Sequence, residues 1–231
     1  MTSLQRKNLM ESQTPFISDQ QQIYLPFWGC LFTENYKKTV TLGDFAPITQ
    51  LIFLYLYYQK NEVRITASEL SEMLSVSKAS VTRVIDALSA HGLIRIESDG
   101  YRKWVTEALE KREMLRKALP LMKSPVERTL YVNALPPNLQ FVTGGIRALS
   151  QLTMLGAKEM DGSFVIDRMS YPHVPKESIV DENTFRDLGG SVIEVWSYNP
   201  RLLSTVNTVD EISLLLSLMS NPDERVQMAL D

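Results

Sequence analysis

The fold of this chain is decided by residues 65–103, which read ITASELSEMLSVSKASVTRVIDALSAHGLIRIESDGYRK. The spacing of Thr66 and Glu69 predicts a capping box at the start of a short helix. A three-residue turn, Ser75-Val76-Ser77, follows, and the Ser77 hydroxyl can cap a second helix. The stretch therefore predicts two helices joined by a turn that is too short for a general helical hairpin.

The second helix and the residues after it complete the pattern. Apolar side chains recur at i, i+3, i+4 and i+7 and predict one buried stripe, made of Val81, Val84, Ile85 and Leu88. Gly92 ends this helix, residues 93–96 alternate as a strand, and residues 102–106 can return as a second strand after a turn at 98–100. Helix, turn, helix and hairpin in this order predict a winged helix.

Flanking segments extend this domain. Asp44 is expected to cap a helix that runs to about Lys60, and a charged helix is expected from about Glu107 to Leu119, where Pro120 stops it. Residues 1–40 show no clear period and predict an irregular arm with one short helix. We therefore divide the chain into an N-terminal arm (1–40), a winged-helix domain (41–122) and a C-terminal domain (123–231).

The C-terminal residues predict a second mixture of strands and helices. Strands are expected at 129–133, 163–166 and 191–196, and a helix from Gly144 to about Ala157. Capping boxes at 208–211 and 221–224 predict two more helix starts. The fold class is therefore α+β: an N-terminal winged helix-turn-helix domain followed by a C-terminal α+β domain.

Composition excludes several classes of protein. The chain has 231 residues, 44% of them hydrophobic, which suffices for a packed core. No run approaches the roughly 18 apolar residues that span a bilayer, and the polar N-terminus lacks the apolar core of a secretion signal. Cys30 is the only cysteine, and His91 and His173 are the only histidines. We expect a cytoplasmic protein with no disulfide framework, no metal site and no cofactor.

Charge is distributed unevenly along the chain. Residues 1–128 hold 17 basic and 14 acidic side chains, a balance of +3, whereas residues 129–231 hold 7 and 13, a balance of −6. The densest basic stretch runs from Arg102 to Arg128, with eight Lys or Arg against four Glu. A polyanionic partner should therefore contact the N-terminal half.

The stretch at 65–103 resembles the DNA-binding core of the MarR-type winged-helix regulators. The resemblance rests on the small-residue turn at 74–77, the pattern Ser80-Val81-Thr82-Arg83-Val84-Ile85 and the exit Leu88…Gly92-Leu93-Ile94, and it covers about Asp44 to Leu119. It implies a bacterial transcription regulator that binds double-stranded operator DNA. Regulators of this type commonly end soon after the wing, whereas here 111 residues follow Pro120.

The face of the second helix opposite the apolar stripe is the candidate for base contacts. Arg83 can reach guanine acceptors or a phosphate, and Thr82 can meet a base edge or a thymine methyl. Hydroxyls and amides at the helix start favour phosphate oxygens, and the hairpin can contact the DNA backbone or minor groove. The candidate DNA-binding residues are Ser77, Lys78, Ser80, Thr82, Arg83, Arg95, Tyr101, Arg102 and Lys103. The alternative is a winged helix that serves only as a protein-interaction module.

A homodimer is expected, because one winged helix buries too little surface for tight specific binding. The expected interface is the aromatic arm (Tyr24, Phe27, Trp28 and Phe32) with the helix at 44–60, and the alternative is that the arm packs on the winged helix of its own chain. The C-terminal domain is expected to recognise a small-molecule effector or a protein partner, with enlargement of the dimer interface as the alternative.

Two rival functions come from other classes. The order of the domains is similar to that of the AbiEi-type antitoxins, which repress their own operon and counter a nucleotidyltransferase toxin, so an antitoxin-like interaction protein is the alternative function. An enzyme is not expected: Asp161, Asp167 and Glu194 lack a nearby lysine to orient water, and Ser170 and His173 lack an evident orienting acid.

Overall fold

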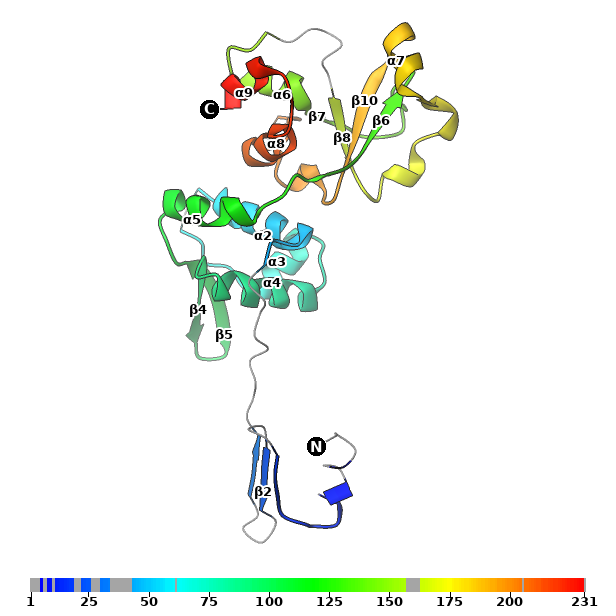
Figure 1. The fold of residues 1–231 in the computed structure, drawn as a ribbon. Coiled ribbons are helices and arrows are strands. Elements are labelled where there is room, and N and C mark those ends of the chain that lie inside the picture. Colours follow the sequence, from blue (N-terminus) through cyan, green and yellow to red (C-terminus); the bar gives the residue numbers. More distant parts are fainter. Residues whose placement is uncertain are drawn as a thin grey trace. The chain divides into compact units, whose positions relative to one another are not determined.

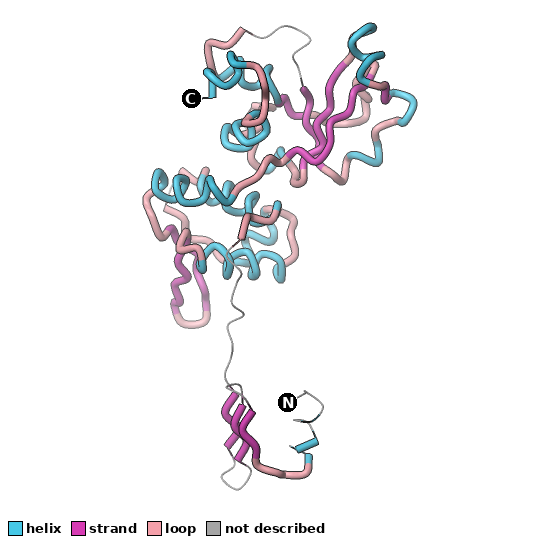
Figure 2. The backbone as a smooth tube through the Cα atoms, in the orientation of Figure 1, coloured by secondary structure: helices cyan, strands magenta, loops and turns pink. Residues whose placement is uncertain are grey.

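A computed structural model gives the fold of the chain (Figures 1 and 2). It describes residues 5, 8–9, 11–18, 22–25, 30–33, 43–60, 62–156, 163–204 and 206–230. Two compact units are present, residues 1–41 and residues 42–231. Each is described by itself below.

The first unit contains a small antiparallel sheet. Its strands are β1 (Phe16–Ser18), β2 (Gln22–Leu25) and β3 (Cys30–Thr33), in the order β1-β2-β3. The prediction of an irregular arm is therefore wrong for these residues. Each strand has only three or four residues, too few to show a period of two, so the pairing is set by backbone hydrogen bonds between strands. The side chains of Tyr24, Phe27, Trp28 and Phe32 lie outside the described part of the structure.

The second unit begins with the predicted winged helix. Its elements are α2 (Pro47–Tyr57), α3 (Ala67–Met73), α4 (Lys78–Ala90), β4 (Ile94–Asp99), β5 (Arg102–Glu107) and α5 (Lys111–Ala118). The capping box at α3 is confirmed, because the Thr66 amide donates to Glu69 Oε2 (2.8 Å) and the Glu69 amide donates to Thr66 Oγ1 (3.3 Å). At α4, Ser77 Oγ accepts the Ser80 amide at 3.2 Å. Local capping thus fixes both helices of the motif.

The wing is a hairpin with a tight turn. Asp99 pairs with Arg102, which leaves Gly100 and Tyr101 as the two turn residues, and Gly100 has φ of +60°. Such a left-handed conformation is easily adopted by glycine. A bridge between Ile65 and Val105 joins the segment before α3 to the hairpin, so the wing is attached to the helices by backbone pairing.

Both flanking helices begin later than expected. Pro47 occupies the first turn of α2, and Ala46, not Asp44, is the N-cap. The Asp44 carboxylate instead forms an ion pair with Lys123 Nζ at 2.8 Å. Helix α5 begins at Lys111 because residues 102–107 belong to β5, and a single 3₁₀ turn, η2 (Leu119–Leu121), ends the helix at Pro120. Tertiary contacts therefore override the local cap signal at Asp44.

The C-terminal half is built on a mixed sheet. Its strands are β6 (Val126–Val132), β7 (Val142–Gly144), β8 (Ser163–Asp167), β9 (Ile179–Val180) and β10 (Ser191–Trp196), in the order β7-β8-β10-β6-β9. The pair β8–β10 is parallel and the other pairs are antiparallel. The helices are α6 (Gly145–Leu152), α7 (Glu182–Leu188), α8 (Glu211–Leu218) and α9 (Glu224–Leu230). The α+β class is confirmed.

One helix end and two helix starts in this half differ from the prediction. The expected helix at 144–157 begins as predicted, with Gly144 as the N-cap of α6, but it ends at Leu152. Asp210, not Thr208, is the N-cap of α8 and accepts the Ser213 amide at 3.0 Å. Thr208 instead forms a β-bridge to Thr143 of β7. Helix α9 begins at Glu224, later than the start predicted at 221. Strand pairing thus displaces the expected cap.

One hydrophobic cluster joins the winged helix to the C-terminal half. It contains Phe53 and Leu56 of α2 together with Trp196 and Leu214. In Figure 1, α6, α8 and α9 lie together on one side of the sheet, and α8 faces α2. Every apolar side chain from Leu51 to Leu54 is buried within the chain itself. The prediction that the helix at 44–60 offers an apolar dimer interface is therefore wrong, because α4 and the C-terminal half of the chain together cover these side chains.

Candidate nucleic-acid interface

Helix α4 presents a polar face opposite its buried stripe. Val81, Val84, Ile85 and Leu88 are buried, as predicted from their spacing. Thr82, Arg83 and Asp86 are exposed on the other side. The Thr82 hydroxyl donates to the Lys78 carbonyl at 2.9 Å, so its methyl group and the hydroxyl lone pairs remain for an external contact. This face has the small and basic residues that base readout in a major groove uses.

The start of α4 gathers hydroxyls around the first backbone amides of the helix. Ser77 Oγ lies 2.8 Å from Ser80 Oγ, and the Lys78 side chain is exposed in the first turn. α4 has thirteen residues and no acidic side chain in its first turn. Its amides and positive dipole end therefore suit a phosphate oxygen.

The wing brings a second set of basic side chains to the same side. Tyr101 stands at the turn with a relative exposure of 107%, and Arg102 and Lys103 are exposed beside it. A cleft of about 620 Å³ separates α4 from the hairpin and the start of α3. Five of the predicted residues line it: Lys78, Thr82, Tyr101, Arg102 and Lys103. Ser77, Ser80, Arg83 and Arg95 are not among its lining residues.

Comparison with known proteins bears on this geometry. The model of the MarR family matches residues 47–103. Residues 47–103 are a MarR-type winged helix. None of the curated proteins and none of the solved structures matches the chain. A MarR-family domain indicates a DNA-binding transcriptional regulator.

The cleft of the MarR-type domain also carries two carboxylates. Glu69 and Asp86 line it together with Ile96 and Trp104. Hydrogen bonds from the Thr66 amide and hydroxyl lower the pKa of Glu69, with a smaller contribution from Arg102, so Glu69 is ionised at neutral pH. Sequence reasoning assigned Glu69 to the capping box alone. The spacing of residues along α3 did not show that this carboxylate would line the cleft beside the wing.

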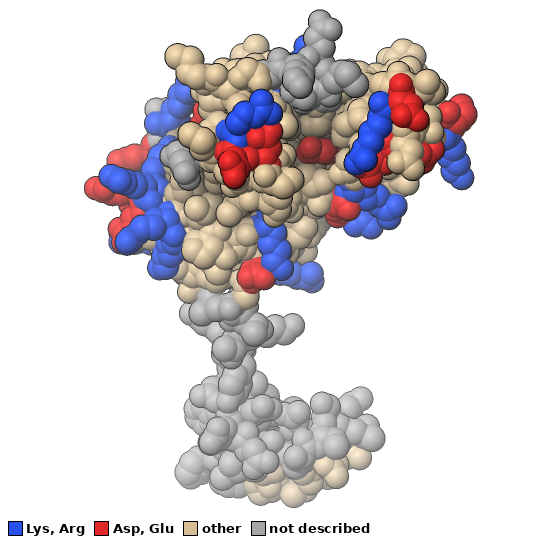
Figure 3. Space-filling view, turned by 45° about the horizontal axis from the view of Figure 1, so that its top comes forward, with Lys and Arg blue, Asp and Glu red and all other residues tan. Residues whose placement is uncertain are grey.

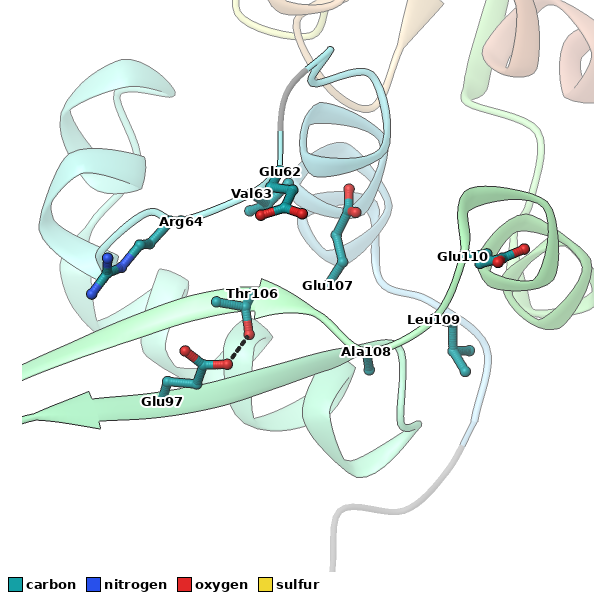
Figure 4. A pocket seen from close by; sticks show the side chains of 9 residues that line it. All are labelled: Glu62, Val63, Arg64, Glu97, Thr106, Glu107, Ala108, Leu109 and Glu110. Carbon is teal, nitrogen blue, oxygen red and sulfur yellow. Dashed lines mark hydrogen bonds between the residues drawn. The ribbon is translucent and has the colours of Figure 1, made fainter.

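The base of the wing is acidic. A pocket of about 670 Å³ there is lined by Glu62, Val63, Arg64, Glu97, Thr106, Glu107, Ala108, Leu109 and Glu110 (Figure 4). The Thr106 hydroxyl donates to Glu97 Oε1 at 3.3 Å. Arg64 is the basic residue of this set. Its Nη2 lies 3.9 Å from Asp99 Oδ2, and its guanidinium lies over the Trp104 ring. Four carboxylates make this pocket unfavourable for phosphate.

Arg95 lies next to the acidic pocket. Its Nη2 donates to the Ala108 carbonyl at 3.4 Å, and it pairs across the hairpin with Thr106, away from the wing turn. This position distinguishes Arg95 from Arg102 and Lys103, which line the cleft. The role of Arg95 in DNA binding stays a prediction.

The polar side chains of the C-terminal half that were weighed as catalytic candidates have different surroundings in the structure. Burial raises the pKa of Glu194, whose Oε2 accepts the Trp196 indole N–H at 2.9 Å. Ser170 and His173 meet only through a backbone hydrogen bond within one turn. Within the described ranges, no three His, Cys, Asp or Glu side chains are arranged to hold a metal ion. No helix in these ranges combines the length and apolar character needed to cross a membrane.

Proposed function

We propose that the chain is a bacterial transcription regulator that binds operator DNA through α4 and the wing. The observation that carries the proposal is the cleft of the MarR-type domain, where Lys78, Arg102 and Lys103 line one hollow beside the exposed face of α4. In this binding mode, Arg83 and Thr82 read base edges in the major groove. Lys78 and the wing contact the backbone.

The regulator acts as a homodimer in this proposal. One recognition helix of thirteen residues and one wing offer few base contacts, and a two-fold operator doubles them without new sequence. The α2 surface is occupied by the chain's own core, so the dimer contact comes from another region. Light scattering of the full chain at micromolar concentration, with and without DNA, measures the assembly, and a monomer mass under both conditions would contradict it.

The C-terminal half receives the signal that controls DNA binding. The formal net charge of −6 over residues 129–231 disfavours a DNA contact. Basic and acidic side chains are interspersed on the face of the molecule shown in Figure 3. Its position supports a controlling role, because it contacts α2 of the MarR-type domain through hydrogen bonds as well as apolar packing. The antitoxin alternative rests on domain order alone and stays a prediction.

The binding mode is tested with an operator selected from random double-stranded DNA. Arg83→Ala should weaken binding by ~1–3 kcal/mol and relax specificity at one position. Lys78→Ala should weaken all sequences alike and reduce the salt slope by about 1, since one phosphate contact is lost. Fluorescence anisotropy at several salt concentrations separates the two effects.

Lys176→Ala is the matched control, because this exposed lysine lies in η5 (Lys176–Ser178) of the C-terminal half. It should bind the operator as the wild type does. If Arg83→Ala and Lys78→Ala also bind as the wild type does, α4 is not the recognition helix.

A further inference from the structure

A polar cavity lies at the carboxyl ends of the two parallel strands of the C-terminal sheet. Its volume is about 260 Å³. Asp167 is the last residue of β8, and Asn199 and Arg201 follow β10 in the turn that opens η6 (Pro200–Leu202). The crevice beyond the carboxyl ends of parallel strands is where open sheets commonly bind ligands, because the loops that leave the strands diverge there.

Two opposite charges line this cavity, and they belong to different networks. Asp167 Oδ1 accepts the Ser170 amide at 2.7 Å. The Arg201 guanidinium donates to Gln140 Oε1. No ion pair joins Asp167 to Arg201 in the described part of the chain. The cavity therefore offers one acceptor for a cationic group and one donor for an anionic group.

Neutral polar groups complete the lining. Asn199 Oδ1 accepts the Arg201 amide at 3.0 Å, which fixes the backbone of the turn. Within the described residues, its amide nitrogen makes no hydrogen bond and is available to a ligand. Asn138 also lines the cavity, while Leu139 and Pro200 give it apolar walls. Groups of both signs, amides and a short apolar wall in one small hollow match a molecule that carries both charges.

We propose that this cavity binds a free α-amino acid as the effector of the regulator. The guanidinium of Arg201 binds the carboxylate, the carboxylate of Asp167 binds the ammonium group, and the side chains of Asn138 and Asn199 bind a short polar side chain. The volume lies below the roughly 300–1,000 Å³ of drug-sized sites, so the ligand is of amino-acid size.

Its regulatory role rests on the proposed DNA-binding function. Asn199 directly follows Tyr198, whose hydroxyl accepts Gln50 Nε2 of α2 at 3.2 Å. The same Gln50 amide donates to the Lys123 carbonyl at 2.9 Å, at the junction between the two halves. Helix α2 packs in turn on α4. An amino acid that changes the turn after β10 is thus one residue from a contact with the MarR-type domain.

The experiment measures ligand binding without DNA, so that it can fail or succeed independently of the operator. Full-length protein is titrated with individual proteinogenic L-amino acids at millimolar concentration, by calorimetry and by thermal shift. For each amino acid that binds, its N-acetyl derivative and its amide are tested, because these lack the ammonium and the carboxylate charge respectively. Both derivatives should bind at least about tenfold more weakly.

Two variants test the assigned side chains. Asp167→Asn keeps the acceptor for the Ser170 amide but removes the charge, and Arg201→Gln removes the guanidinium. Each variant should bind the amino acid roughly tenfold more weakly, or weaker still. Arg168→Gln and Asp187→Asn are the matched controls, since both residues are exposed and lie outside the cavity lining. The controls should bind as the wild type does.

The proposal is overturned if no amino acid binds, or if binding survives both variants. It is also overturned if Arg201→Gln abolishes binding while Asp167→Asn and the N-acetyl derivative have no effect, because the site would then be a simple anion site. Measurement of operator affinity with and without the bound amino acid is a separate step. Failure of DNA binding alone would reject the proposed function and leave the amino-acid site intact.

Discussion

At the scale of single residues, Asp210 has an unusual environment. Its side chain is 5% exposed, and its Oδ1 accepts the Tyr58 hydroxyl and the Ser213 amide, both at 3.0 Å. Oδ2 is buried with no hydrogen-bond partner among the described residues. Burial raises the pKa of Asp210, against the lowering effect of its hydrogen bonds, and it also raises the pKa of Tyr58. Tyr58 therefore remains a hydrogen-bond donor while half of the carboxylate is unsatisfied.

Replacement of this residue gives a pH-dependent prediction. Because the pKa of Asp210 is raised on folding, the folded chain favours the neutral carboxyl. This contribution to the free energy of unfolding is lost as pH rises through the folded-state pKa. Asp210→Asn keeps the N-cap acceptor and the acceptor for Tyr58 but has no charge to bury. The variant should therefore be more stable than the wild type at neutral pH. The difference in stability should shrink as the pH falls toward the ordinary aspartate pKa of about 3.9.

Urea unfolding at a series of pH values measures this difference in the free energy of unfolding. Carboxylates such as Asp181 and Asp223, whose pKa is lowered by hydrogen bonds, affect both proteins equally and cancel. A wild type that gains stability over Asp210→Asn as pH rises would show that the charge is compensated, contrary to the prediction.

At the scale of elements, sequence reasoning succeeded where the signals are local. Helix α4 was predicted because its apolar period and its cap at Ser77 agree with each other. The short strand β7 was not predicted, because its position depends on distant contacts. Gly145 has φ of +56°, and a Cβ there would lie 2.2 Å from Ser163 Oγ of β8. No local pattern reports that approach, so only the helix that follows the strand was predicted.

The candidate site shows the same division. The exposed face of α4 follows from its period, and the wing follows from the turn at Gly100. The position of Glu69 in the cleft and that of Arg95 at the wing base depend on how α3 and the hairpin pack together. Those positions could not be read from spacing alone.

The charge balance of the cleft gives a prediction at this scale. Lys78, Arg102 and Lys103 line it together with Glu69 and Asp86. Removal of one carboxylate charge by Asp86→Asn should strengthen DNA binding by roughly two- to fivefold at low salt. The gain should fall as salt rises, because the exposed charge is then screened. Anisotropy titrations at two salt concentrations measure it.

Asp187→Asn, in exposed α7, provides the same charge change far along the chain from the cleft. It should change DNA affinity less than Asp86→Asn does. An equal gain in the two variants would mean that only net charge matters and that Asp86 does not face the DNA.

At the scale of the whole molecule, the MarR-type domain is not packed as a separable module. Buried side chains of α2 contact the C-terminal half in one cluster, and Gln50 and Tyr58 donate hydrogen bonds across the junction. Gln50 itself is 2% exposed. A fragment that ends near residue 122 would expose this surface to water and leave Gln50 and Tyr58 without partners. Function is therefore best measured on the full chain.

The shared core predicts that residues 42–231 unfold in one cooperative step. Trp104 in the wing and Trp196 in β10 report on the two halves separately. With Trp28→Phe as background, Trp104→Phe leaves Trp196 as the sole tryptophan, and Trp196→Phe leaves Trp104. In each variant the urea transition followed by fluorescence should coincide with that followed by far-ultraviolet circular dichroism, because loss of either half uncovers α2 and its buried polar groups. Comparison within each variant removes the effect of the substitution on stability. The prediction is contradicted if the Trp104 signal changes while most of the helical signal persists. Two such separate transitions would show that the winged helix unfolds by itself. Coupling through α2 could not then carry a signal between the halves.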